Sequence, residues 1–326
     1  MKTTFTKPQA LKIIFFCWIV CFSENVFPDE NYSYRTQNVI LVVIDGPRYS
    51  ETWGDPKHVN IPHQFSDLAP QGVFFSNFRN NGQTYTNAGF TAIVTGHYQA
   101  IDNHGAELPA NPTLFQLWLK HSGLPNTSAW IITSKDKLQI LSNSSHPDWQ
   151  DQWMPSWNCG KKGKGRGAGY RKDKTTFHLA MKILEEDHPR LSLIAFREPD
   201  VSAHKGDMEG YVRGLKDTDS YVFKIWEFIQ SDPVYQNKTA LFITNDHGRH
   251  LDSVDSGFYD HGDDCDGCRH ISLLLLGPDF KKGISISSAH EQIDIVPLIA
   301  DLLGFTLPRT SARAGLKQAF VNIENY

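Results

Sequence analysis

NVILVVID, residues 38–45, is the stretch of sequence that decides the fold. Six consecutive apolar residues lie between its polar ends, and a strand that is apolar on both sides is typical of a buried parallel sheet. Four further runs of this kind follow: AWIIT (129–133), LSLIAF (191–196), ALFITND (240–246) and ISLLLLG (271–277). Segments with the apolar spacing of helices lie between and after them, at residues 87–95, 113–121, 175–186, 211–229 and 293–303. This alternation predicts an α/β fold with a mostly parallel central sheet and helices on both faces.

The charge balance argues against a nucleic-acid partner. The 326 residues carry 32 Lys and Arg against 36 Asp and Glu, so the formal net charge is −4. A protein held to phosphates by charge normally needs a basic surface, and we therefore expect no stable nucleic-acid partner. Hydrophobic residues make up 40% of the chain, which is enough for a large core and excludes a disordered protein.

The N-terminus has the pattern of a secretory signal peptide. Lys2, Lys7 and Lys12 precede the apolar run IIFFCWIVCF (13–22), which ends at a polar Ser-Glu pair. Ten helical residues span about 15 Å, half of a bilayer's hydrocarbon core, so a membrane anchor fits less well. We expect residues 1–23 to be removed, which gives a secreted or periplasmic protein with no transmembrane anchor after processing.

Three cysteines remain after that cleavage: Cys159, Cys265 and Cys268. The last two form a C-x-x-C pair, for which a local disulfide is the favoured interpretation in an oxidising compartment and a thiol pair the alternative. A zinc knuckle would need two more ligands, which the sequence does not offer plainly.

Carboxylates follow three of the predicted strands. Asp45 ends the first run, Asp200 follows the third, and Asp246 ends the fourth. Two of them have a histidine nearby, because His204 lies four residues after Asp200 and His247 directly follows Asp246. The carboxyl ends of parallel strands share one edge of a sheet, so these side chains are expected to meet there. Mixed Asp and His ligation favours zinc or another divalent transition ion over calcium or magnesium.

Further histidines compete for a place among these ligands. His261 is followed by a glycine and lies fourteen residues after His247. The alternatives are His250, His270 and His290, and His270 is the main rival because it lies near the start of the last predicted strand. Lys135, which follows the second strand, is a candidate donor to an anion.

The order of these motifs resembles the alkaline phosphatase superfamily, and most closely its type I phosphodiesterase and nucleotide pyrophosphatase branch. The motifs are VVIDGPR, NGQTYTNAGFTAIVTG, EPDVSAH, TNDHG and a DHG followed by RHISLLLLGPDFKKG. The resemblance spans about residues 38–304 and implies one metal-dependent hydrolase domain over residues 34–326. Its implied activity is the hydrolysis of small-molecule phosphate esters with two divalent ions, zinc being the expected metal.

The resemblance also implies roles for individual residues. Thr84 would be the nucleophile, Asn87 would support a phosphate oxygen, and Arg48 matches an arginine of the family motif. The first ion would be held by Asp45, Thr84, Asp246 and His247, and the second by Asp200, His204 and His261. The family spacing favours His261 over His270. Sulfatases share the fold, but residues 84–87 do not match the C-x-P-x-R or S-x-P-x-R segment of their nucleophile.

The sequence also bears on whether the substrate is a phosphate diester or a phosphate monoester. A diester needs a surface for its second substituent, which the aromatic stretch 149–157 could supply with Tyr85 and Phe90. A monoester needs more positive charge, which the basic loop 161–174 could supply. The resemblance favours the diester. A phosphomonoesterase or phosphotransferase on the same site, and a catalytically silent metal-stabilised binding protein, are the alternatives.

Overall fold

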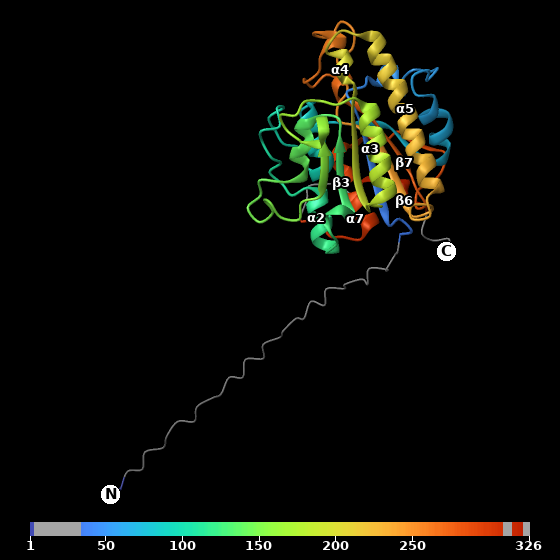
Figure 1. Ribbon diagram of the computed structural model, residues 1–326. Helices are drawn as coiled ribbons and strands as arrows, with labels where there is room; N and C mark the ends of the chain where they lie inside the picture. The colour runs from blue at the N-terminus through green and yellow to red at the C-terminus, as the bar shows by residue number, and fades with distance from the viewer. Residues whose placement is uncertain (3–33, 309–314, 322–326) are drawn as a thin grey trace. The chain divides into compact units, whose positions relative to one another are not determined.

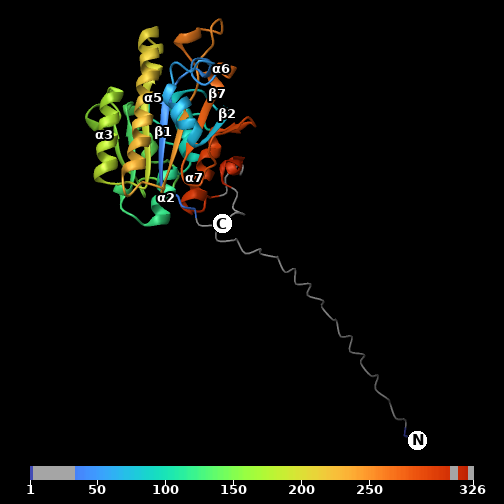
Figure 2. The same ribbon diagram turned by 90° about the vertical axis from the view of Figure 1, so that its right-hand side faces the viewer.

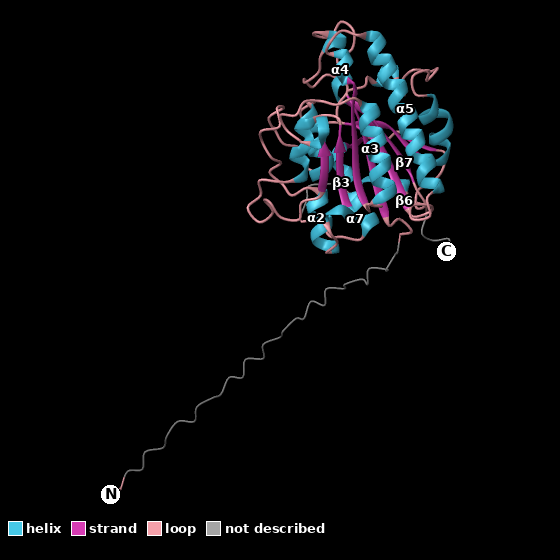
Figure 3. Cartoon of the chain, in the orientation of Figure 1, coloured by secondary structure: helices cyan, strands magenta, loops and turns pink. Residues whose placement is uncertain are grey.

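Nine strands of the described chain form one twisted sheet, which runs through the protein between its helices (Figure 3). Their order is β4-β3-β5-β1-β6-β7-β2-β8, and β9 also pairs with β2. The strands are β1 Asn38–Asp45, β2 Val73–Arg79, β3 Ala129–Thr133, β4 Ser156–Cys159, β5 Leu191–Pro199, β6 Thr239–Asn245, β7 His270–Leu276, β8 Ile284–Ile286 and β9 His290–Glu291. Only β7 runs antiparallel to its neighbours. The predicted mostly parallel sheet is therefore confirmed.

Helices cover both faces of this sheet, as the two views in Figures 1 and 2 show. They are α1 Thr86–Thr95, α2 Leu114–Ser122, α3 Asp173–Glu186, α4 Asp200–Ala203, α5 Met208–Ser231, α6 Asp266–Arg269 and α7 Ile295–Leu303. One core contains side chains of α1, α2 and α7, and the other contains side chains of α3 and α5. Alternate residues of β1 enter opposite cores, which is why the sequence of this central strand is apolar throughout.

The computed structural model of the protein describes residues 1–2, 34–308 and 315–321, and Tyr34–Tyr326 groups into one compact unit. The predicted signal peptide lies outside the described residues, apart from the first two. Among the helices that the structure describes, none is long and apolar enough to cross a membrane.

The reversed strand β7 has a local cause. The chain leaves β6 and returns through residues 246–269, which contain only short helical turns. A parallel neighbour needs a long crossover to the other end of the sheet, whereas this loop stays at the end where β6 stops. The loop that carries His261 is consequently held at the carboxyl edge of the parallel strands.

We predict that Ile40→Ala lowers the free energy of unfolding by about 2–5 kcal/mol, because Ile40 is fully buried in β1 and its loss leaves a cavity. Ile284→Ala in β8 is the matched control, since that side chain is 40% exposed. Its effect should stay within about 0.5 kcal/mol. Denaturant unfolding of both variants measures the difference, and equal effects would contradict the central place of β1.

Candidate active site

Three adjacent parallel strands, β5, β1 and β6, bring the predicted carboxylates together. Asp45 is the last residue of β1, Asp200 begins α4 directly after β5, and Asp246 directly follows β6. All three are buried, with at most 2% of the residue exposed. The rule that ligands lie outside the carboxyl ends of parallel strands therefore places a site at this edge of the sheet, near α4 at the top of Figure 1.

Asp45, Asp246 and His247 form the first group of ligand-type side chains, here called the Asp45 cluster. His247 Nε2 lies 3.6 Å from Asp45 Oδ1 and 3.3 Å from Asp246 Oδ2. All three atoms are buried, and none of them has a hydrogen-bond partner among the described residues. The other oxygen of Asp246 accepts hydrogen bonds from the backbone N–H groups of Gly46 and His247. Three converging, unpartnered ligand atoms are what a bound cation requires.

Asp200, His204 and His261 form the second group, the Asp200 cluster. The Oδ1 atom of Asp200 lies 3.2 Å from His204 Nε2 and 3.3 Å from His261 Nε2, and the two nitrogens are 3.1 Å apart. The second ring nitrogen of His261 contacts the carbonyl oxygen of Thr84 at 2.7 Å, which fixes the orientation of the ring.

Buried cations connect the two clusters. Lys135 Nζ lies 2.7 Å from Asp45 Oδ2 and 2.7 Å from Asp200 Oδ2, so the ammonium bridges one carboxylate of each cluster. Arg249, which is fully buried, makes a close ion pair with Asp200. The imidazole rings of His247 and His261 also stack, with centroids 3.7 Å apart. The two clusters therefore form one continuous polar centre.

Burial dominates the protonation of this centre. It raises the pKa of Asp45 to about 7 and raises the pKa of Asp246 well above its ordinary value. Burial would also raise the pKa of Asp200, but Lys135 and the two histidines hold it well below its ordinary value. For His247 and His261 burial lowers the pKa, so both rings are neutral and able to bind a metal ion.

A cavity of about 390 Å³ opens beside the Asp200 cluster and is named here the lysine-lined cavity. Lys135, Lys137 and Lys205 contribute to its wall, together with Tyr170 from the basic loop. Thr86, the first residue of α1, also lines it, and Lys135 Nζ donates a hydrogen bond of 3.2 Å to the Thr86 hydroxyl. A helix N-terminus, three lysines and a hydroxyl suit a small anionic group.

Three residues with predicted catalytic roles lie outside the lining of this cavity. The Thr84 hydroxyl donates a hydrogen bond of 2.6 Å to the carbonyl oxygen of Asp263. Asn87 is fully buried and donates to the carbonyl oxygen of Asp102, which ties α1 to the neighbouring loop. Arg48 is also buried and forms ion pairs with Glu51 and Asp252.

The alternative ligand His270 is separated from both clusters by its own contacts. Its Nε2 atom lies 2.9 Å from the carbonyl oxygen of Ser76, and its ring stacks on Tyr49 with centroids 3.7 Å apart. Of the two competing histidines His261 and His270, it is His261 whose Nε2 atom lies 3.3 Å from Asp200 Oδ1.

The aromatic surface expected for a diester is not assembled at the cavity. Phe90 is fully buried in the core, and Trp149 and Trp153 pack around the ammonium of Lys120. Of these expected aromatic side chains, Tyr85 alone lies near the clusters, with its ring centroid 5.9 Å from that of His261.

The expected local disulfide between Cys265 and Cys268 is wrong for this structure, because both cysteines are free.

Sequence reasoning missed Thr86 and Arg249 as members of the centre. Thr86 is the first residue of a predicted helix, and the attraction of helix N-termini for anions was an available signal. Arg249 directly follows the Asp-His-Gly triplet, but the fold of residues 246–269 determines that its side chain points into the centre. No local sequence pattern predicts the direction of this side chain.

Comparison with known proteins decides the family. The sequence profile of the Sulfatase family matches residues 37–305. The chain belongs to the sulfatase family. This match confirms the resemblance to the alkaline phosphatase superfamily, in which the sulfatases are included.

Curated relatives of this sulfatase-family chain match only in part. Arylsulfatase K of Danio rerio is 35% identical over 79 residues, which are 24% of this chain and 14% of the relative. The 2,3-bisphosphoglycerate-independent phosphoglycerate mutase of Clostridium perfringens is 26% identical over 130 residues, 39% of this chain and 24% of that enzyme. The matched segments thus span less than a quarter of either relative.

Solved structures with the same fold include one bound to a sulfated sugar substrate, a phosphonate monoester hydrolase and a nucleotide pyrophosphatase/phosphodiesterase. BT4656, solved with its substrate D-glucosamine-2-N,6-O-disulfate, has a TM-score of 0.68 at 13% identity over 88% of this chain and 80% of its own. A phosphonate monoester hydrolase from Silicibacter pomeroyi has a TM-score of 0.60 at 14% identity, over 85% of this chain and 75% of its own. Murine ectonucleotide pyrophosphatase/phosphodiesterase 5 has a TM-score of 0.62 at 14% identity, over 87% of this chain and 100% of its own. At these identities the likeness establishes the fold alone.

Proposed function

We propose that this sulfatase-family protein hydrolyses phosphate monoesters, with Thr86 as nucleophile and two divalent ions as cofactors. The observation that carries the proposal is the position of the Thr86 hydroxyl. It lies at the N-terminus of α1, in the wall of the lysine-lined cavity, and contacts the lysine that bridges the two clusters. A secreted or periplasmic location rests on the predicted signal peptide and stays a prediction.

The two clusters fit two divalent ions. The Asp45 cluster offers three buried ligand atoms without hydrogen-bond partners among the described residues, and the Asp200 cluster offers three converging ones. Carboxylate and neutral imidazole ligands suit Zn²⁺, which is the metal we propose. Such ions, when bound, lower the pKa of a nearby hydroxyl and neutralise charge on a transferring phosphoryl group.

The chain's own groups then perform the reaction in two steps. The Thr86 hydroxyl loses its proton to solvent and its oxygen attacks phosphorus. The bond to the ester oxygen breaks, and the departing alkoxide takes a proton from solvent to leave as the alcohol. Water next attacks the phosphothreonine, which releases phosphate and restores the hydroxyl. Lys135 donates to the Thr86 oxygen and supports its negative charge during both steps.

The charge of the centre favours a monoester over a diester. With both ions bound, the three buried carboxylates are deprotonated ligands and contribute −3, and Lys135 and Arg249 contribute +2. Burial would lower the pKa of Lys135, but Asp200 and Asp45 raise it above its ordinary value, so its charge is retained. With two divalent ions the net charge is +3, and ionised Thr86 reduces it to +2. A phosphomonoester dianion balances this charge, whereas a monoanionic diester leaves +1.

We therefore predict that a nitrophenyl phosphate monoester is cleaved with kcat/KM at least about tenfold above that of the corresponding diester, or about 1.4 kcal/mol. Parallel assays at saturating zinc measure the ratio, and the common nitrophenol leaving group makes the two substrates comparable. A tenfold preference for the diester would contradict the charge argument.

Sulfate ester hydrolysis is the second candidate, because the family match favours it. Residues 86–90 read Thr-Asn-Ala-Gly-Phe and lack the cysteine or serine of the sulfatase nucleophile segment. A sulfate monoester also brings only one negative charge to the centre. Nitrophenyl sulfate, assayed beside the phosphate esters, tests this candidate directly.

A further inference from the structure

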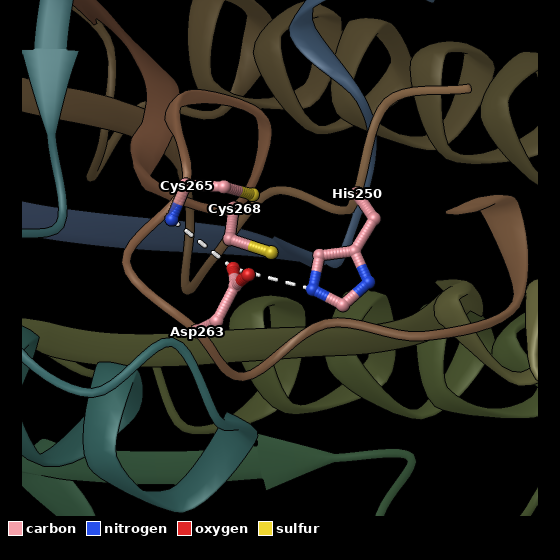
Figure 4. Close-up of side chains that lie close together, drawn as sticks. All are labelled: His250, Asp263, Cys265 and Cys268. Atoms are coloured by element: carbon pink, nitrogen blue, oxygen red, sulfur yellow. Dashed lines mark hydrogen bonds and ion pairs between the residues drawn. The ribbon is translucent and has the colours of Figure 1, made fainter. Parts of the chain in front are cut away.

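Another group of ligand-type side chains lies beyond the two clusters of the candidate active site. It contains His250, Asp263, Cys265 and Cys268 and is named here the cysteine cluster. One ligand atom from each residue lies within 4.8 Å of the other three. Figure 4 shows these side chains converging, with the Cys268 sulfur and the Asp263 carboxylate close to the His250 ring.

Backbone hydrogen bonds join residues 248–249 to residues 267–268 and so form this cluster. The N–H of Gly248 donates to the carbonyl oxygen of Cys268 at 2.7 Å, and the N–H of Arg249 donates to that of Gly267 at 2.9 Å. A Cβ on Gly248 would lie 2.0 Å from the Gly267 oxygen, and one on Gly267 would lie 2.5 Å from the Arg249 oxygen. Glycine at both positions permits the close approach that brings His250 to the C-x-x-C pair.

His250 is held as a metal ligand would be. The residue is only 2% exposed, and its Nε2 atom has no hydrogen-bond partner among the described residues although it lies 3.2 Å from Asp263 Oδ1. The other ring nitrogen lies 3.4 Å from the Ser256 hydroxyl. A histidine whose second nitrogen is occupied in this way presents the first to an ion.

We propose that the cysteine cluster binds one Zn²⁺ ion. Two thiolates, one imidazole and one carboxylate complete a tetrahedral zinc site, and the C-x-x-C spacing is typical of one. Four protein ligands leave no open position, so the site is structural. Binding releases the two thiol protons to solvent as the two Zn–S bonds form.

The proposed ion would brace the loop that supplies His261 to the Asp200 cluster. Asp263 lies two residues after His261, and its carbonyl oxygen accepts the hydrogen bond of the Thr84 hydroxyl at 2.6 Å. The carbonyl oxygen of Thr84 in turn contacts His261 Nδ1 at 2.7 Å. The structure thereby assigns Thr84 a positioning role between the cysteine cluster and the Asp200 cluster.

Cobalt substitution of the full chain under reducing conditions tests the site. The expected result is a thiolate-to-cobalt charge-transfer absorption in wild type, which disappears in the C265A/C268A double variant and persists in Cys159→Ala. Elemental analysis of the zinc form should find one zinc fewer per chain in the double variant and no change in Cys159→Ala. Absence of the band from wild type, or equal zinc in the double variant, would overturn the proposal.

A second readout covers a double variant that fails to fold. In wild type, zinc should protect Cys265 and Cys268 from alkylation, and a chelator should restore their reactivity. Unprotected thiols, or a Cys265–Cys268 disulfide in the zinc-loaded protein by peptide mass spectrometry, would also overturn the proposal. Cobalt–thiolate absorption arises only from cysteine ligands. It is therefore independent of the proposed phosphatase activity and should be unchanged in Thr86→Ala.

Discussion

Thr86→Ala is expected to lower kcat/KM for a phosphate monoester by about a thousandfold or more, a loss of about 4 kcal/mol of transition-state stabilisation. The substitution removes the only atom of the residue that can attack phosphorus. It costs the fold one hydrogen bond from Lys135, which contributes about 1 kcal/mol. Circular dichroism and metal content should therefore stay close to wild type.

Thr84→Ala is the matched control, because both threonines are buried and only two residues apart. Thr84 contacts the Asp263 carbonyl oxygen and is absent from the lining of the lysine-lined cavity. Its loss should loosen the His261 loop and lower activity less than Thr86→Ala does. Thr86→Ser should keep measurable activity, since it retains a hydroxyl. If Thr84→Ala lowered kcat/KM more than Thr86→Ala does, Thr84 and not Thr86 would be the nucleophile.

Asp246→Asn is expected to remove at least one metal ion and to lower turnover about a hundredfold or more. The carboxylate is fully buried, and its unpartnered oxygen faces His247, so an amide in its place offers a neutral and weaker ligand. Elemental analysis and steady-state assays on the same preparation measure both effects.

Asp279→Asn provides a buried carboxylate outside the site as control. Asp279 accepts hydrogen bonds from the backbone N–H groups of Arg35 and Thr36 and from the Thr36 hydroxyl. Its substitution should lower stability without changing the metal content per folded chain. If Asp246→Asn kept the full metal content, the Asp45 cluster would not be a metal site.

Local pattern was sufficient to place the central strands and the carboxylates that end them. The apolar runs predict β1 and β3 at their observed bounds, because burial on both faces leaves no polar residue between the ends of either strand. Asp45, Asp200 and Asp246 converge because parallel neighbours end at one edge. The same reasoning could not predict β2, where Ser76 and Asn77 interrupt the apolar pattern and the pairing register shifts.

Long-range contacts determine the rest of the site. Lys135 follows its strand as expected, but its bridge between Asp45 and Asp200 depends on the order β3-β5-β1 in the sheet. His250 likewise meets Cys268 only because the chain turns back after β6 instead of crossing the sheet. The spacing of residues along the sequence predicts neither the Lys135 bridge nor the approach of His250 to Cys268.

Phosphopeptide mapping tests the central claim most directly. Wild-type protein is mixed with a phosphate monoester, quenched in acid during turnover, digested and analysed by mass spectrometry. The account predicts one phosphoryl group on the peptide that contains α1, located at Thr86 and absent from Thr86→Ala. Turnover without a phosphorylated peptide, or with the phosphoryl group on Thr84, would contradict it.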